Sequence, residues 1–203
     1  FLPKIIEDLW EERELAKKEN DLVRSQAIKI IMYSFYGVLG SSGCRFYDDR
    51  LASSVTLRGH EIMQETRQWI EEQNYKVIYG DTDSIFVIAD KTINKEQVQT
   101  EGRRLANIIN KKWSHVIAER FELSSHLELE METVYERFFM PTIRGQQKGS
   151  KKRYVGLQTD EGNSQVVFKG MEAVRSDWTL LAKKFQLGLY QYVFSDKDPS
   201  EFI

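Results

Sequence analysis

Two short runs of β-branched and aromatic residues, separated by four turn-forming residues, constrain the fold of this chain more than any other feature. The runs cover residues 75–79 and 84–89, and the sequence Gly-Asp-Thr-Asp at 80–83 connects them. Runs of this composition are typical of buried strands, and a connection this short joins antiparallel neighbours. The sequence therefore predicts a β-hairpin with two aspartates at its tip.

The segments on both sides of this hairpin follow helical or strand patterns. Apolar residues at helical spacing predict helices over residues 3–18, 22–39, 49–73, 95–121 and 176–194. Only three residues separate the first two helices, so these must pack antiparallel as a helical hairpin. Further strands are expected over residues 127–134, 137–143, 153–157 and 166–169. The predicted fold is α+β, with an antiparallel sheet backed by helices and a protruding two-helix hairpin.

Composition narrows the class of protein. The 203 residues are 41% hydrophobic, which is enough for a folded core, and no apolar run approaches the ~18 residues of a membrane span. The single cysteine, Cys44, cannot form an internal disulfide, which fits a reducing compartment. The formal net charge of −2 argues against a nucleic-acid partner, but the charge is uneven. Residues 144–153 carry five basic side chains and no acid, whereas residues 119–136 carry six glutamates.

The two hairpin aspartates, Asp81 and Asp83, are candidate metal ligands. Alternation in extended chain points both side chains to one face, although a tight turn can aim them differently. Two carboxylates this close raise each other's pKa unless a cation lies between them, and Mg²⁺ prefers such hard oxygen ligands. The competing interpretation is an ordinary solvated turn, because Asp and Gly are common turn residues.

The helical hairpin carries candidate triphosphate ligands. Arg13 and Lys17 lie four residues apart on one helix face, and Lys29, Tyr36 and Gly37 share a face of the next helix. Basic side chains from two antiparallel helices can bind a triphosphate, and glycine permits close approach of a ligand. The alternatives are a solvated surface for the two basic residues of the first helix, and a core position under the hairpin for Tyr33 and Tyr36.

A basic strand forms the third candidate site. Lys151, Lys152, Arg153 and Tyr154 could bind the nucleic-acid backbone, or they could form a solvated loop. Glu132 belongs to a row of three alternating glutamates, a pattern more typical of a solvent-facing strand. The three histidines and Cys44 show no metal-ligand spacing, so no zinc site is expected.

Taken together, three motifs resemble those of family B DNA polymerases. The sequence Tyr-Gly-Asp-Thr-Asp-Ser at 79–84 is similar to the metal-binding hairpin of that family. Residues 29–37 resemble its fingers-helix motif Lys-x-x-x-Asn-Ser-x-Tyr-Gly, with Tyr33 in place of the usual asparagine. The sequence Lys-Lys-Arg-Tyr at 151–154 resembles its primer-template motif. Other segments (37–40, 50–54, 140–144 and 167–171) look most like the bacterial DNA polymerase II branch.

This resemblance implies template-directed DNA synthesis by a two-metal mechanism, in repair or translesion replication. Asp83 would be the primary ligand of two Mg²⁺ ions, with Mn²⁺ as a substitute, Asp81 the secondary ligand and Glu132 a weaker candidate. The ions would activate the primer 3′-hydroxyl and stabilise the transferring phosphate. Lys29 would contact the incoming triphosphate together with Arg13 and Lys17, and Tyr36 would border the nascent base pair.

The resemblance also implies partners and a domain plan. Primer-template DNA would contact the motif Lys151–Tyr154, most directly through Lys152 and Tyr154. The minor groove of the DNA offers hydrogen-bond acceptors that are common to all base pairs. Further partners would be deoxynucleoside triphosphates and a sliding clamp, which would bind a part of the protein beyond residue 203. The protein would not bind a membrane. It would be located in the bacterial cytoplasm, near the nucleoid. Residues 1–40 would form the fingers hairpin, 41–175 the palm and 176–203 the start of the thumb.

One expected motif of the family does not occur in this chain. The family's other metal-binding aspartate precedes a Ser-Leu-Tyr-Pro-Ser stretch, which is absent here and is expected upstream of Phe1. We therefore expect the chain by itself not to extend a primer. Two other classes also fit parts of the pattern. A glycosyltransferase could use the Asp-x-Asp pair for a nucleotide sugar, and a noncatalytic module could bind nucleic acid through the basic strand.

Overall fold

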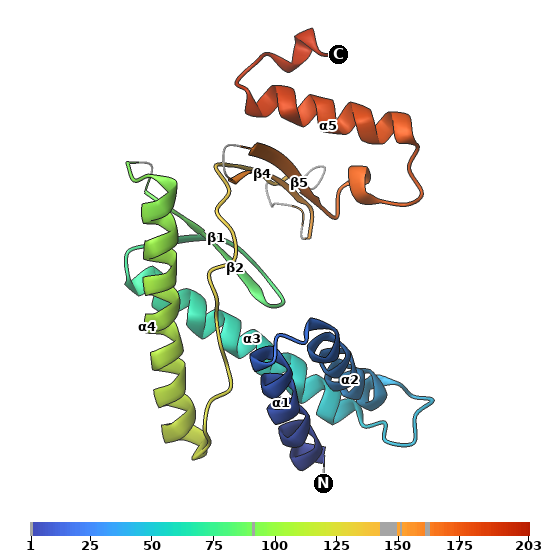
Figure 1. Ribbon diagram of the computed structural model, residues 1–203, viewed down its shortest axis with the longest axis vertical. Coiled ribbons are helices and arrows are strands. Elements are labelled where there is room, and N and C mark those ends of the chain that lie inside the picture. The colour runs from blue at the N-terminus through green and yellow to red at the C-terminus, as the bar shows by residue number, and fades with distance from the viewer. Residues whose placement is uncertain (1, 91, 143–149, 151, 161–162) are drawn as a thin grey trace. The chain divides into compact units, whose positions relative to one another are not determined.

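Five α-helices and five strands make up the regular structure of this computed structural model, which describes residues 2–90, 92–142, 150, 152–160 and 163–203 (Figure 1). The helices are α1 (Leu2–Lys18), α2 (Leu22–Gly40), α3 (Asp49–Glu72), α4 (Lys95–Phe121) and α5 (Leu180–Phe194). The strands are β1 (Lys76–Asp81), β2 (Ser84–Ile88), β3 (Arg137–Phe139), β4 (Tyr154–Asp160) and β5 (Asn163–Lys169). Short 3₁₀ turns η1 (Glu172–Val174) and η2 (Pro199–Glu201) flank α5.

The predicted α+β class is confirmed, with all described strand pairs antiparallel. The strands divide into two sheets rather than one: β1 pairs with β2, and β3, β4 and β5 form the second sheet in that order. The chain folds as two compact units, Phe1–Glu65 and Thr66–Ile203, called unit 1 and unit 2 below. The predicted domain limits at residues 40 and 175 stay predictions.

Unit 1 contains the predicted helical hairpin. Asp21 starts α2 as its N-cap, because its side chain accepts a hydrogen bond from the Arg24 backbone N–H at 3.0 Å. The Arg24 guanidinium reaches back to Glu12 on α1, with an N–O distance of 3.0 Å. Ala16 and Ile28 are buried in this unit, which allows the helices to pack closely. The short connection and the cap thus determine the hairpin locally.

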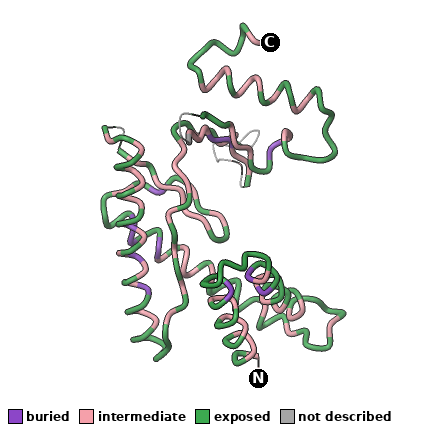
Figure 2. The backbone as a smooth tube through the Cα atoms, viewed as in Figure 1, coloured by how far each residue is buried: buried purple, intermediate pink, exposed green. Residues whose placement is uncertain are grey.

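The core of unit 2 lies where the end of α3 meets α4. The rings of Trp69 and Trp113 have centroids 4.6 Å apart, and the indole N–H of Trp113 donates to the Thr66 hydroxyl at 2.8 Å. Leu105 and Ile109 of α4 are also buried, and Figure 2 shows purple segments on both helices. Every polar atom of the buried Trp–Thr pair is thereby satisfied, which avoids the cost of an unpaired buried donor.

The predicted strand over residues 127–134 is wrong. Residues 123–136, called the extended segment below, run back along α4 (Figure 1), and residues 123–135 belong to neither sheet of the described structure. The Asn110 side chain instead donates to the Leu129 carbonyl at 2.9 Å and accepts from the Leu129 N–H at 2.8 Å. A side-chain amide thus occupies backbone groups that a neighbouring strand would use. The alternation itself is confirmed, since the three glutamates of the row are exposed and the residues between them are half-buried.

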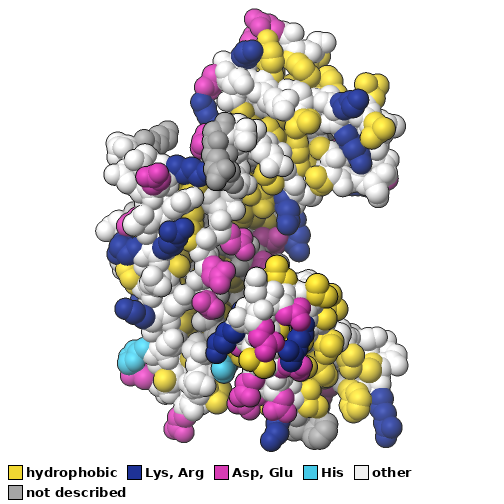
Figure 3. Space-filling view, viewed as in Figure 1, with side chains coloured by type: hydrophobic (Ala, Val, Ile, Leu, Met, Phe, Trp, Pro, Cys, Tyr) yellow, Lys and Arg dark blue, Asp and Glu magenta, His cyan; other side chains and the backbone are white. Residues whose placement is uncertain are grey.

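Helix α5 packs on the β3–β4–β5 sheet through Tyr190, whose ring centroid lies 5.6 Å from those of Phe139 and Phe168. It begins at Leu180 rather than at residue 176, because Thr179 caps it by accepting the Ala182 N–H. Apolar side chains remain exposed on α5, and yellow surface is visible over this part of the molecule in Figure 3. Among the described helices, none combines the length and apolar character that crossing a membrane requires.

Candidate functional site

The two predicted metal ligands lie at the tip of the β1–β2 hairpin. Asp81 pairs with Ser84 as the last step of the ladder, so that Thr82 and Asp83 form the turn. Thr82 has a left-handed φ of 44°, and the Asp83 N–H donates back to the Asp81 carbonyl. Two-residue hairpin turns use positive φ because the resulting twist matches that of the two flanking strands. The predicted hairpin and both aspartates are therefore where the sequence pattern placed them.

The side-chain surroundings of the aspartates fit a hard divalent cation. Thr82 donates its hydroxyl to Asp81 Oδ1 at 3.2 Å, and Ser84 donates to Asp83 Oδ1 at 3.4 Å. Asp83 is exposed and Asp81 is partly covered, with Lys152 Nζ 3.9 Å from Asp81 Oδ1. Each carboxylate accepts one hydroxyl hydrogen bond, and the ammonium is 3.9 Å from Asp81, so oxygen lone pairs remain that can bind a metal. This oxygen-only donor set suits Mg²⁺.

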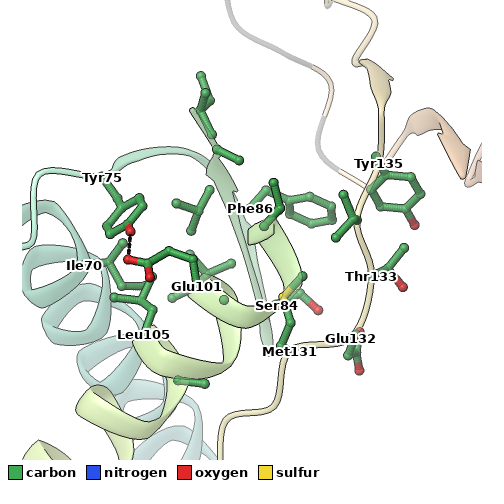
Figure 4. Close-up of a pocket in the computed structure, with 18 of the residues that line it drawn as sticks. Ile70, Tyr75, Ser84, Phe86, Glu101, Leu105, Met131, Glu132, Thr133 and Tyr135 are labelled. Atoms are coloured by element: carbon green, nitrogen blue, oxygen red, sulfur yellow. Dashed lines mark hydrogen bonds between the residues drawn. The ribbon is translucent and has the colours of Figure 1, made fainter. Parts of the chain in front are cut away.

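Glu132 lies on the extended segment and lines the same cavity as Asp83. This cavity of about 900 Å³ is bounded by β2, α4 and the extended segment, and Figure 4 shows Glu132 and Thr133 along one side. Met131 points from the same segment toward α4. In the part of the chain that the structure describes, no three acidic, histidine or cysteine side chains are close enough to hold one ion. The structure thus places Glu132 near the hairpin but not in one cluster with both aspartates.

The members of the basic strand have three different surroundings. Lys151 lies outside the described residues, whereas Lys152 is exposed and approaches Asp81. The Arg153 guanidinium forms an ion pair with Glu172, which also accepts a hydrogen bond from Gln186. Tyr154 opens β4 and is half-buried. Of the described members of this strand, Lys152 therefore presents its charge toward the hairpin aspartates.

Tyr154 belongs to an aromatic cluster that joins the two sheets. Phe86 of β2 lies at its centre, with ring centroids 5.2 Å from Phe138 and Tyr154 and 6.5 Å from Tyr135. Burial, aided by the neighbouring Tyr135, raises the pKa of Tyr154 to about 12. Its phenol is neutral near pH 7 and can donate a hydrogen bond. Gly156 is required beside this cluster, because a Cβ there would overlap the Tyr135 ring.

In unit 1, the predicted triphosphate ligands of α1 have local contacts. The Arg13 guanidinium carbon lies 5.9 Å from the Trp10 ring centroid, and within the described structure its buried Nε has no hydrogen-bond partner. Lys17 forms an exposed ion pair with Glu14 at 2.7 Å. Such a pair contributes little stability, so Lys17 can exchange it for a stronger anion.

The predicted ligands of α2 lie on an exposed surface. Lys29 Nζ is 5.5 Å from the Tyr33 ring centroid, and the Tyr36 hydroxyl is within 2.9 Å of Thr56 Oγ1 on α3. Tyr33 and Tyr36 are 69% and 49% exposed, so neither is a core residue. A Cβ at Gly37 would meet no atom within 4 Å, which leaves room for a ligand beside the backbone. The core interpretation of these tyrosines is therefore wrong.

Sequence reasoning missed two residues that contact the backbone of Lys152. The Tyr79 hydroxyl accepts its N–H at 2.7 Å, and Gly170 lies directly against its carbonyl. Tyr79 belongs to the hairpin motif at residues 79–84, but the motif assigns no separate role to this tyrosine. Gly170 follows β5, and nothing in its local sequence indicates what approaches it.

Comparisons with known proteins agree along the whole chain. The family model described as DNA polymerase family B matches residues 1–203. The chain is 48% identical over 202 residues to DNA polymerase II of Escherichia coli K12, covering 100% of this chain and 26% of that protein. It is 32% identical to a DNA polymerase of Thermococcus gorgonarius, covering 100% of this chain and 25% of that one.

The fold has a solved counterpart as well. The structure of the family B DNA polymerase from the archaeon Pyrobaculum calidifontis superposes with a TM-score of 0.63 at 26% identity. That match covers 100% of this chain and 23% of the archaeal one. The chain thus spans about a quarter of the length of these proteins.

Proposed function

This chain belongs to DNA polymerase family B, and we propose that it supplies the metal-binding hairpin, the triphosphate-binding helices and a primer-template contact of a DNA-directed DNA polymerase. The observation that carries the proposal is the pair Asp81 and Asp83, held at an open hairpin tip beside the Lys152 ammonium. A site for phosphoryl transfer needs both an anionic metal anchor and a cation facing the nucleic-acid phosphates.

Asp83 and Asp81 would hold Mg²⁺, or Mn²⁺ in its place, and Glu132, which lines the same cavity as Asp83, is the weaker candidate ligand. When bound, two such ions would activate the primer 3′-hydroxyl and stabilise charge on the transferred phosphate. The hydroxyls of Thr82 and Ser84 orient the two carboxylates. The chain's own contribution is thus to orient both carboxylates at the hairpin tip before the metal binds.

Primer-template DNA would contact Lys151, Lys152 and Tyr154. Tyr154, as a neutral phenol, can donate to the acceptors that all base pairs present in the minor groove. Arg153 supports the strand through Glu172, so its role is to hold β4 rather than to bind DNA.

The incoming deoxynucleoside triphosphate would bind α1 and α2. Arg13, Lys17 and Lys29 would contact its phosphates, and Tyr36 with Gly37 would border the base. Tyr33 replaces an asparagine of the family motif and cannot offer the amide's paired donor and acceptor, which alters how the nucleotide is positioned.

Broader aspects of the proposal follow from the likeness to DNA polymerase II. The whole protein would act in repair or translesion replication in the bacterial cytoplasm, near the nucleoid, with a sliding clamp as a partner. Its fingers, palm and thumb would correspond to residues 1–40, 41–175 and 176–203. The family match favours this function over a nucleotide-sugar transferase, and the aspartate pair favours it over a noncatalytic binding module.

The decisive experiment replaces Asp83 by asparagine in the full-length polymerase. Loss of one metal-binding carboxylate should lower the rate of primer extension by about 10³-fold or more, because the metal supplies several kcal/mol of transition-state stabilisation. Extension is measured on a labelled primer-template with Mg²⁺.

Asp177→Asn is the matched control, because Asp177 is exposed and pairs with Arg175 away from the hairpin. This variant should extend the primer at the unmodified rate. Extension by Asp83→Asn within tenfold of that rate would refute the proposal.

A further inference from the structure

Lys152 adopts a backbone conformation that side chains other than glycine seldom take. Its φ is 62°, in the left-handed region, at a turn residue that precedes β4. A non-glycine residue stays in that region only when neighbouring contacts hold it. At Lys152 these contacts are made with Tyr79 and Gly170.

Both backbone polar groups of Lys152 are held. Its N–H donates to the Tyr79 hydroxyl at 2.7 Å, over a sequence separation of 73 residues. Its carbonyl packs against Gly170, where φ is 60° and where a Cβ would overlap the Lys152 oxygen. The backbone of Lys152 is therefore held between β1 on one side and the end of β5 on the other.

The position of the Tyr79 hydroxyl is itself determined by β1. Tyr79 pairs with Phe86 across the hairpin, and the two ring centroids are 5.5 Å apart. The strand register shifts between Val77 and Tyr79, an irregularity of the kind that redirects a side chain. Tyr79 also lies two residues before Asp81, so the residue that holds Lys152 belongs to the strand that carries the aspartates.

This geometry limits the region that the ammonium of Lys152 can reach. A lysine side chain has a flexible four-carbon stem, so a fixed backbone is the main means of confining its charge. With the backbone held by Tyr79, Nζ lies 3.9 Å from Asp81 Oδ1. One hydroxyl thereby joins the backbone of Lys152 to the strand that carries Asp81.

We propose that Tyr79 is a positioning residue that acts through Lys152: its hydroxyl holds the Lys152 backbone so that the ammonium faces the hairpin aspartates and binds the primer-template phosphates beside them. This inference rests on the proposed function, because it assigns Lys152 a DNA contact. Tyr79 itself touches neither DNA nor nucleotide in this account.

A double-mutant cycle in the full-length polymerase tests the inference. Tyr79→Phe keeps the ring and removes the hydroxyl, whereas Lys152→Ala removes the ammonium and keeps the backbone N–H that Tyr79 binds. Each single change should raise KM and Kd for primer-template about three- to tenfold, with a smaller effect on kcat. In the Lys152→Ala background, Tyr79→Phe should have no further effect on either constant.

Salt dependence provides a second readout that a general loss of stability does not move. Both single variants should flatten the slope of log Kd against log salt by the same amount, since each removes the same phosphate contact. Tyr192→Phe is the control, because it also removes a single hydroxyl hydrogen bond, from Tyr192 of α5 to Glu201 of η2 at 2.9 Å, and should leave the slope unchanged.

The possible failures are distinguishable. If Lys152→Ala leaves DNA binding unchanged, the DNA contact and the inference are both wrong. If Lys152→Ala weakens binding but Tyr79→Phe does not, or if the two effects multiply in full, the DNA contact stands and the positioning role is overturned.

Discussion

Lys152, Arg153 and Tyr154 are consecutive in the chain, yet the structure gives each a different task. Lys152 faces Asp81, Arg153 pairs with Glu172, and Tyr154 joins the aromatic cluster around Phe86. Of the three, Tyr154 alone lies in β4, and Lys152 before it has a left-handed φ of 62°, so the turn that precedes the strand separates their side chains. The basic motif predicted a nucleic-acid contact but could not tell which residue would present its charge.

Glu101 offers a prediction about pH at the same scale. The Arg104 guanidinium, aided by the Tyr75 hydroxyl, lowers the pKa of Glu101 from 4.5 to about 2 (Figure 4). A carboxyl whose pKa is lowered on folding stabilises the fold above its unfolded pKa, and this contribution disappears as the pH falls from about 4.5 to about 2. Glu101→Gln should therefore reduce the loss of Tm over that range.

Circular dichroism melts between pH 2 and pH 6 provide this measurement. Glu7→Gln, at an exposed position of α1, is the control and should retain the acid sensitivity of the unmodified chain. An acid-induced fall in Tm that is the same in Glu101→Gln and in the unmodified chain would show that the Glu101 network does not stabilise the fold.

At the scale of elements, helices were predicted well because their signals are local. The predicted bounds of α4 agree with the structure. A capping box between Asn94 and Gln97 starts the helix, and both residues are close together in the sequence. The β1–β2 hairpin was also predicted, since its turn lies between its own strands. The extended segment was predicted wrongly, because whether an alternating run joins a sheet depends on a partner elsewhere in the chain.

Asn110 is the residue on which the extended segment depends, and its replacement is the test at this scale. Asn110→Ala removes both hydrogen bonds to the Leu129 backbone and should lower the free energy of unfolding by about 1–3 kcal/mol. The amide of Leu129 should also exchange with deuterium markedly faster. Asn107→Ala, on the exposed face of α4, should change neither quantity by a comparable amount.

Should Leu129 keep its protection in Asn110→Ala, packing of the half-buried side chains would hold the segment instead. Urea unfolding followed by fluorescence, together with hydrogen exchange, separates these two explanations. The outcome bears on the candidate site, because Glu132 lies on the same segment and lines the same cavity as Asp83.

For the whole molecule, the net charge of −2 does not bear on the proposed nucleic-acid partner, because the charge is unevenly distributed. Basic and acidic side chains are interspersed on the face drawn in Figure 3, and the carboxylates proposed to hold metal offset the lysines proposed to hold phosphate. An electrostatic argument about nucleic-acid binding depends on local charge, because screening limits its range to about 10 Å at moderate salt.

The isolated chain should not extend a primer. It spans about a quarter of the length of DNA polymerase II, and its sequence contains no Ser-Leu-Tyr-Pro-Ser stretch with the second metal-binding aspartate of the family. We expect extension by the purified 203-residue chain to stay at background under conditions where the full-length polymerase completes the template. Template-dependent extension that is lost in Asp83→Asn would contradict this expectation.

The sequence by itself determined the helices, the hairpin, the aspartate pair and the family, because each is encoded in residues close together along the chain. Tertiary structure alone decided that Lys152 rather than Arg153 faces Asp81, and that Tyr79 and Gly170 hold it there. It also decided that the alternating segment stays outside both sheets. These outcomes depend on contacts between residues far apart in the chain, and no local propensity or periodicity encodes such contacts.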